Sequence, residues 1–173
     1  LKEDGKLRGD FFAKLDVGGT SSELNGTVSW RPNSKSIKIA TKFSDLKIAR
    51  LAKKLPKFGW LDIVDLTVRG SADMTMSTKG KVESASFDLR AGKGHIAYTD
   101  LWPKGLPIAS ARLRGTFDGE IEKLEIEQLF ADIEIAKVTA RATAIRVGKG
   151  LKIDGRVNAD KLAFENLAAF WPK

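Results

Sequence analysis

Residues 113–117 read Leu-Arg-Gly-Thr-Phe, and this stretch decides the fold class. Its apolar and glycine residues alternate with polar ones, and a period of two is typical of a β-strand with one buried face. The pattern is an apolar residue two positions before a glycine and an apolar residue or alanine two positions after it. It recurs at 7–11, 24–28, 68–72 and 153–157. Five similar strands indicate a chain that is mainly β.

Outward from these five stretches, the alternation continues through most of the 173 residues. Clusters of glycine, proline, asparagine and serine separate the expected strands, and such clusters are typical of turns. They lie at 18–19, 32–34, 92–94, 103–105 and 148–150. Strands joined by short turns favour antiparallel pairing, and an open sheet of about ten strands tends to curl. We therefore expect a strongly curved antiparallel sheet.

Each of the five stretches places its glycine on the apolar face of the expected strand. A glycine inside a strand costs about 0.5–1 kcal/mol relative to alanine, so five such positions suggest a purpose. Without a side chain on the inner face, a sheet can bend sharply toward that face. We expect a crease in the sheet at Gly9, Gly26, Gly70, Gly115 and Gly155. The alternative is that these glycines mark bulges or close packing against helices.

Two stretches break the period of two and predict two short amphipathic helices. In the first, apolar residues 48, 51, 52 and 55 have the spacing of one helix face. Ser44 or Asp45 can cap its start, and Pro56 ends it. In the second, residues 164, 167, 168 and 171 have the same spacing, and Pro172 follows.

The two helical stretches match each other in sequence, so a strand-then-helix unit recurs along the chain. This recurrence predicts the organisation of the chain. We expect residues 1–44 to end one repeat, and residues 45–161 to form the next as a short helix plus an antiparallel meander. Residues 162–173 would begin the following repeat as a short helix.

Groups for catalysis or metal binding are few. The chain has no cysteine, which excludes disulfides, thiolate metal sites and cysteine nucleophiles. Its single histidine, His95, lies in a turn-like stretch, and no phosphate-binding glycine loop or nucleophile motif occurs. In the run of carboxylates from Glu120 to Glu134, Glu125 and Glu127 share a polar strand face with Lys123, which indicates a solvated face and not a catalytic pair. We expect a protein that is not an enzyme and that holds no cofactor or metal.

The chain is basic: 30 lysine and arginine residues against 22 acidic ones give a net charge of +8. This charge favours an anionic partner such as lipid headgroups. The basic residues are spread along the chain and not gathered with stacking aromatics, so we do not expect nucleic acid. No apolar run approaches the ~18 residues of a membrane span, and residues 1–4 do not read as a signal peptide. We expect a piece of a longer protein, with any anchor outside it.

Several of these features together resemble one protein family. They are Phe-Ser-Asp-Leu at 43–46 before the first helix, the connection Asp-Leu-Trp-Pro-Lys-Gly-Leu-Pro-Ile at 100–108, the strand 113–117, and the terminal stretch 162–172. The chain is similar, most clearly from 36 to 173, to the large AsmA-like envelope proteins of Gram-negative bacteria, of the YhdP type. The resemblance implies an open, repeating β-groove in a periplasmic protein anchored to the inner membrane. Such a groove carries phospholipid toward the outer membrane and has no catalytic residues.

A groove of this kind would be lined by the apolar faces of the strands, because acyl chains gain about 0.8 kcal/mol per buried methylene. The residues expected to line it are Phe11, Phe43, Leu113, Phe117, Leu124, Ile126, Phe130, Ile153 and Val157. The expected partners are phospholipid or another acyl-chain lipid and neighbouring repeats of the same parent chain. The inner and outer membranes would be reached through parts outside these residues.

Two other interpretations of the same residues stay open at this point. In the first, the apolar residues form a closed, dry core, and the chain is a structural or interaction module of an envelope protein, for outer-membrane assembly or as a spacer. In the second, the chain is a basic module for anionic glycans or nucleic acid. An open apolar face would favour the groove over the closed core.

Overall fold

The computed structural model describes residues 2–3, 6–16, 21–53, 61–97, 105–133, 136–148 and 150–160. Its one α-helix in these ranges is α1 (Ile48–Ala52), and residues 61–63 form a short 3-10 turn. The strands are β1 (Lys2–Glu3), β2 (Lys6–Asp16), β3 (Ser21–Trp30), β4 (Ser36–Lys47), β5 (Val64–Asp65), β6 (Thr67–Ser77), β7 (Val82–Ala91), β8 (Gly94–Ile96), β9 (Leu106–Ile108), β10 (Ser110–Asp118), β11 (Lys123–Asp132), β12 (Lys137–Val147) and β13 (Gly150–Asp160).

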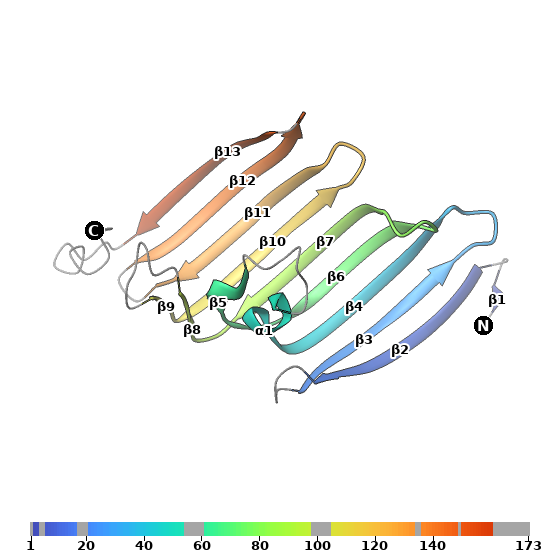
Figure 1. The fold of residues 1–173 in the computed structure, drawn as a ribbon, viewed down its shortest axis with the longest axis horizontal. Coiled ribbons are helices and arrows are strands. Elements are labelled where there is room, and N and C mark those ends of the chain that lie inside the picture. Colours follow the sequence, from blue (N-terminus) through green and yellow to red (C-terminus); the bar gives the residue numbers. More distant parts are fainter. Residues whose placement is uncertain are drawn as a thin grey trace.

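Ten strands form one antiparallel sheet in the order β1-β2-β3-β4-β6-β7-β10-β11-β12-β13 (Figure 1). Strands that are neighbours in the chain are mostly neighbours in the sheet, as in a meander. The two-residue strand β1, paired with the long strand β2, forms one edge and β13 forms the other, so the sheet does not close into a barrel. The expectation of a mainly β, open antiparallel sheet with very little helix is confirmed.

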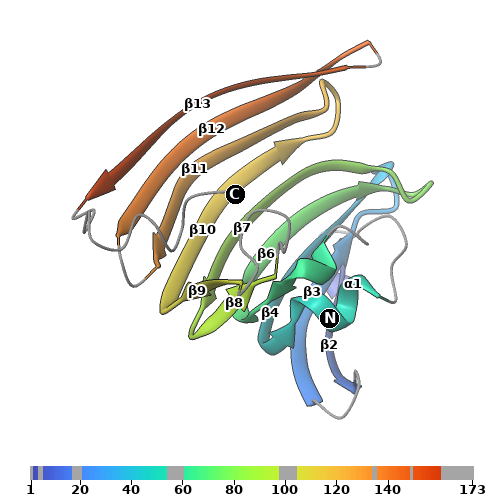
Figure 2. The same ribbon diagram turned by 60° about the vertical axis from the view of Figure 1, so that its left-hand side comes forward.

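A small second sheet, in the order β5-β8-β9, lies with α1 beside the large sheet. The main buried cluster lies between the two sheets: Leu106 and Ile108 come from β9, Leu66 follows β5, Val68 belongs to β6, and all four are at most 9% exposed. Partly buried residues of β4, β5, β7, β8 and β10 and of α1 pack around this cluster. Figure 2 shows the long strands bowed, with α1 on the inner side of the bow. The core therefore covers one end of the inner face only.

The register of the ladders decides which residues share a face, because directly opposed residues of antiparallel strands point to the same side. Three rows cross the sheet on the inner side. The first is Phe11, Gly26, Thr41, Ala72, Phe87, Gly115, Ile126, Ala142 and Gly155. The second is Gly9, Val28, Ile39, Met74, Ala85, Phe117, Leu124, Ala144 and Ile153. The third is Ala13, Leu24, Phe43, Gly70, Leu89, Leu113, Leu129, Ala140 and Val157.

These three rows contain no charged residue, and we call the surface they form the apolar face. The apolar face continues beyond the third row to Val68 of the buried cluster, against which α1 packs. Val68 pairs with Ala91, two positions from the pair of Gly70 and Leu89. The residues that alternate with these rows form the opposite side of the sheet. They are mostly charged or hydroxylated, and we call that side the polar face.

Two bulges keep the apolar rows aligned. In β4, two residues, Ser44 and Asp45, stand opposite one residue of β6, between the pairs Phe43–Gly70 and Leu46–Val68. In β11, the ladder to β12 shifts between Ile126 and Leu129. One extra residue on one strand reverses the alternation beyond it.

The β4 bulge also explains where the prediction for the first helix is wrong. Ser44 and Asp45 do not cap a helix, because β4 continues to pair with β6 as far as Lys47. Asp45 takes a left-handed conformation with φ of 52°, and its carbonyl oxygen accepts a hydrogen bond from the Ser22 hydroxyl at 2.8 Å. The helix begins only at Ile48.

The second predicted helix, at 162–173, lies outside the described residues, as do Leu55 and Pro56. The predicted boundary between residues 44 and 45 falls inside β4, and the sheet is continuous across it. The division into repeats stays a prediction.

Candidate functional site

The residues that the structure describes leave the apolar face largely uncovered. Among the described residues, six hydrophobic side chains are buried, and no large side chain is shielded to below 2% exposure. On the same face Val28 is 37% exposed, and Ile153 and Val157 of β13 are 67% and 68% exposed. Large contiguous apolar surfaces are rare on monomeric soluble proteins and usually mark a binding site. The apolar face is therefore the candidate functional site.

The structure brings eight of the nine predicted groove residues together on this face. Ile126 and Phe11 lie in the first row, Phe117, Leu124 and Ile153 in the second, and Phe43, Leu113 and Val157 in the third. The rows are adjacent, so these side chains form one continuous surface from β2 to β13. Period-two alternation is enough to place these eight residues, because none of them lies beyond a bulge that would reverse the alternation of its strand.

The prediction for the ninth residue, Phe130, is wrong. It pairs with Arg112 of β10 and Thr139 of β12, which puts it on the polar face. The bulge at Glu127 and Gln128 reverses the alternation of β11, and Leu129 takes the place in the third row opposite Leu113. The sequence carries a signal of this bulge. Unbroken alternation from Leu124 to Phe130 would turn the polar residue Gln128 toward the apolar face.

The glycines of the five repeated stretches differ in their surroundings. A Cβ on Gly26 would stand 2.5 Å from the ring of Phe11, and one on Gly115 would stand 2.9 Å from the ring of Phe87. In both cases an aromatic residue of the neighbouring strand lies over the glycine it pairs with, an arrangement that compensates for the missing side chain. Gly70 and Gly155 are crowded by backbone atoms of the adjacent strands, whereas Gly9 has nothing within 4 Å. Whether these glycines cause the curvature stays a prediction.

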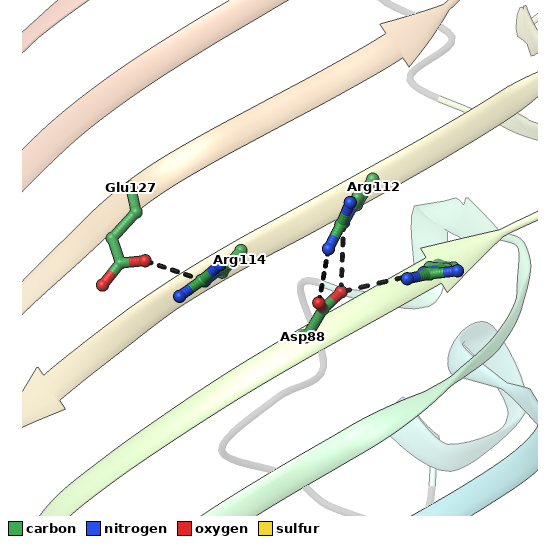
Figure 3. Close-up of polar contacts among 5 residues, drawn as sticks. Asp88, Arg112, Arg114 and Glu127 are labelled. Atoms are coloured by element: carbon green, nitrogen blue, oxygen red, sulfur yellow. Dashed lines mark hydrogen bonds and ion pairs between the residues drawn. The ribbon is translucent and has the colours of Figure 1, made fainter.

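The polar face carries cross-strand ion pairs. Asp88 of β7 accepts two hydrogen bonds from Arg112 of β10, from Nη2 at 2.6 Å and from Nε at 3.2 Å (Figure 3). These bonds hold the pKa of Asp88 below its usual value and raise the pKa of Arg112. Arg114 lies one step further along β10, and its Nε is 2.9 Å from Glu127 of β11.

Groups for other chemistry are sparse in the described ranges. His95 pairs with Asp65 across β8 and β5, with 3.6 Å between Nδ1 and Oδ2 and about half of each side chain exposed. No group of three or more histidine, cysteine or acidic residues is placed to hold a metal ion within these ranges. None of the helical residues described forms a segment long and apolar enough to cross a membrane.

Comparison with protein-family models, with curated proteins and with solved structures found no match to the chain.

Proposed function

We propose that this chain is a non-catalytic segment of an envelope lipid-transport protein, and that its apolar face binds and conducts phospholipid acyl chains. The observation that carries the proposal is the alignment of three apolar rows across nine long strands, with little cover over them from the described part of the chain. Because the rows run across the strands, they form a continuous path along the length of the sheet.

The dimensions and energetics of this path suit acyl chains. Neighbouring strands are about 4.8 Å apart, so the path from β2 to β13 is roughly 40 Å long. Acyl chains gain about 0.8 kcal/mol for each methylene that leaves water. Since none of the three rows contains a charged residue, an acyl chain could occupy many positions of similar free energy, which is what conduction requires.

The proposed function also implies a cellular location for this chain. A segment that conducts phospholipid between inner and outer membrane would lie in the periplasm, within a parent protein anchored to the inner membrane. Neighbouring repeats would continue the sheet at its open edges. The outer edge of β13 favours this arrangement, because all its residues are exposed and no described strand pairs with that side.

The alternative is a structural or interaction module with a closed, dry core. It requires large apolar side chains that are shielded from water, and the described residues include none below 2% exposure. The two edges of the sheet, at β1 and β13, have no further partner strand among the described residues, which also favours the groove. The buried cluster around Val68 and Ile108 accounts for folding at one end of the sheet without covering the rest.

Native mass spectrometry of the purified chain, mixed with phospholipid, tests the proposal. Ile126→Asn places an amide in the middle of the apolar face. The matched control is Ile145→Asn on the neighbouring strand β12, because Ile145 pairs with Lys123 and Lys152 on the polar face. We expect phospholipid adducts on the parent chain and the control and a marked loss on Ile126→Asn. A parent chain that stays free of lipid, or equal adducts on both variants, would contradict the proposal.

A further inference from the structure

Six of the ten arginines of the chain gather in two adjacent rows of the polar face. Arg69, Arg90 and Arg112 stand directly opposite one another across β6, β7 and β10. Arg114 lies in the next row, and Arg141 and Arg156 are directly opposed across β12 and β13. Like charges in opposed positions destabilise a sheet, so each such pair needs a compensating negative charge.

Within the chain, part of this repulsion is offset. Asp88 binds Arg112 through two hydrogen bonds and also lies 3.9 Å from the Nε of Arg90. Glu127 forms an ion pair with Arg114, with 2.9 Å between Oε2 and Nε (Figure 3). The opposed pair of Arg141 and Arg156 differs, because neither guanidinium forms an ion pair with any carboxylate that the structure describes.

The polar face is hollowed at this pair. A hollow of about 1140 Å³ spans β10 to β13, and its cationic lining is Arg114, Lys123, Arg141, Lys152 and Arg156. Three carboxylates also line it. Glu127 and Glu125 are already paired with Arg114 and Lys123, the latter at 2.8 Å, which leaves Asp154 against three cations. The hollow therefore has an excess of positive charge at its β12–β13 wall.

We propose that this hollow is a binding site for a phosphate-bearing anion, held between Arg141 and Arg156. A guanidinium presents a planar fork of donors that matches two oxygens of a phosphate. A phosphate has enough oxygens to accept from both forks at once, and it removes the repulsion between them. This site lies on the opposite side of the sheet from the acyl-binding face and does not depend on the proposed function.

Binding of inorganic pyrophosphate, measured by calorimetry and by the shift in Tm, tests the site. Sodium chloride at the same ionic strength separates specific binding from screening. We expect pyrophosphate to raise the Tm of the parent chain well beyond the chloride control. Arg141→Gln and Arg156→Gln should each weaken pyrophosphate binding about tenfold or more, since each removes charge-assisted hydrogen bonds. Each should also raise the Tm in low salt without ligand, because it removes the opposed like charge.

Arg8→Gln is the matched control. Arg8 lies on the polar face of the other edge, in β2, opposite Ser29, so its replacement should leave pyrophosphate binding unchanged. Arg156→Lys is a further variant, which keeps the positive charge but loses the planar fork of donors. It should also weaken pyrophosphate binding, and it tests the site even if a single glutamine variant fails to fold. Equal Tm shifts by pyrophosphate and chloride, or undiminished binding in both single variants, would overturn the site.

Vesicles distinguish the two sources of a phosphate group. Vesicles of phosphatidylcholine with phosphatidylglycerol, compared with phosphatidylcholine alone, report whether a lipid headgroup occupies the hollow. If Arg156→Gln reduces binding to the anionic vesicles and pyrophosphate competes with them, the ligand is a headgroup. If pyrophosphate binds and the vesicles do not, the ligand is a soluble phosphate compound. Both results uphold the site, and binding to neither contradicts it.

Discussion

The ring of Phe87 lies over Gly115, the residue it faces across the β7–β10 ladder. A Cβ built on Gly115 would stand 2.9 Å from Cζ of this ring and nearer still to the backbone oxygen of Glu125. Gly115 is buried and belongs to the central row of the apolar face. The space above it is therefore filled from a neighbouring strand on one side and closed by backbone on the other.

Gly115→Val is expected to destabilise the fold by about 1–3 kcal/mol, because overpacking of this kind forces side chains and backbone to shift. Urea denaturation measures the change. Gly9→Val is the matched control, since it makes the same substitution on the apolar face of β2, where nothing lies within 4 Å. An unchanged urea midpoint for Gly115→Val, or an equal loss in both variants, would show that the close packing around Gly115 does not constrain the sheet.

Leu124→Asp distinguishes an open face from a closed core. On an uncovered face the new carboxylate reaches water, so we expect a cost of about 1–2 kcal/mol and a chain that still unfolds cooperatively. Val68→Asp is the contrast, because Val68 is 7% exposed and a carboxylate there would be buried without a partner. It should cost several kcal/mol. Thermal unfolding followed by circular dichroism measures both, and global unfolding by Leu124→Asp would argue for a closed core.

The β11 bulge predicts opposite behaviour for two consecutive residues. The chain has no cysteine, so Leu129→Cys and Phe130→Cys each introduce a single labelling site. A polarity-sensitive fluorophore at 129 should shift to the blue when phospholipid is added, because Leu129 shares a row with Leu113. The same fluorophore at 130 should not respond, since Phe130 faces Arg112 and Thr139. The reverse pattern would mean that β11 lacks the bulge.

Asp88→Asn is expected to lower stability modestly and in a pH-dependent way. The hydrogen bonds from Arg112 depress the pKa of Asp88 in the folded chain. Its contribution is therefore fully present above the unfolded-state pKa of about 3.9 and is lost as the pH falls through the lower folded-state pKa. Urea midpoints of the parent chain and the variant should differ at pH 7 and converge toward pH 3. A difference that persists unchanged at pH 3 would assign the effect to packing.

Most of the large sheet could be predicted from the sequence. Alternation around Gly115 and its four counterparts gives the strands, and the turn clusters give antiparallel neighbours. This works because a half-buried strand has a side-chain period of two that local sequence shows directly. Eight of the nine residues predicted to line a groove share the apolar face for the same reason.

Bulges and short elements could not be predicted in this way. A bulge changes the face of every residue beyond it, and its position is set by pairing with a distant strand, as at Glu127 opposite β10. The helix prediction at Ser44 and Asp45 was wrong for a related reason, because β6 supplies partners that continue β4 to Lys47. The small sheet of β5, β8 and β9 has strands of only two or three residues, too short to show a period.

The central claim is that the acyl chains of lipid contact the apolar face of the sheet. A photocrosslinking residue at Phe117, in the second apolar row, tests it most directly when compared with the same residue at Thr116, its neighbour on the polar face of β10 and outside the lining of the hollow. Irradiation in Gram-negative cells, followed by mass spectrometry of the purified chain, reports covalent phospholipid. We predict phospholipid adducts at 117 and none at 116. Adducts at neither position, or equal adducts at both, would contradict the account.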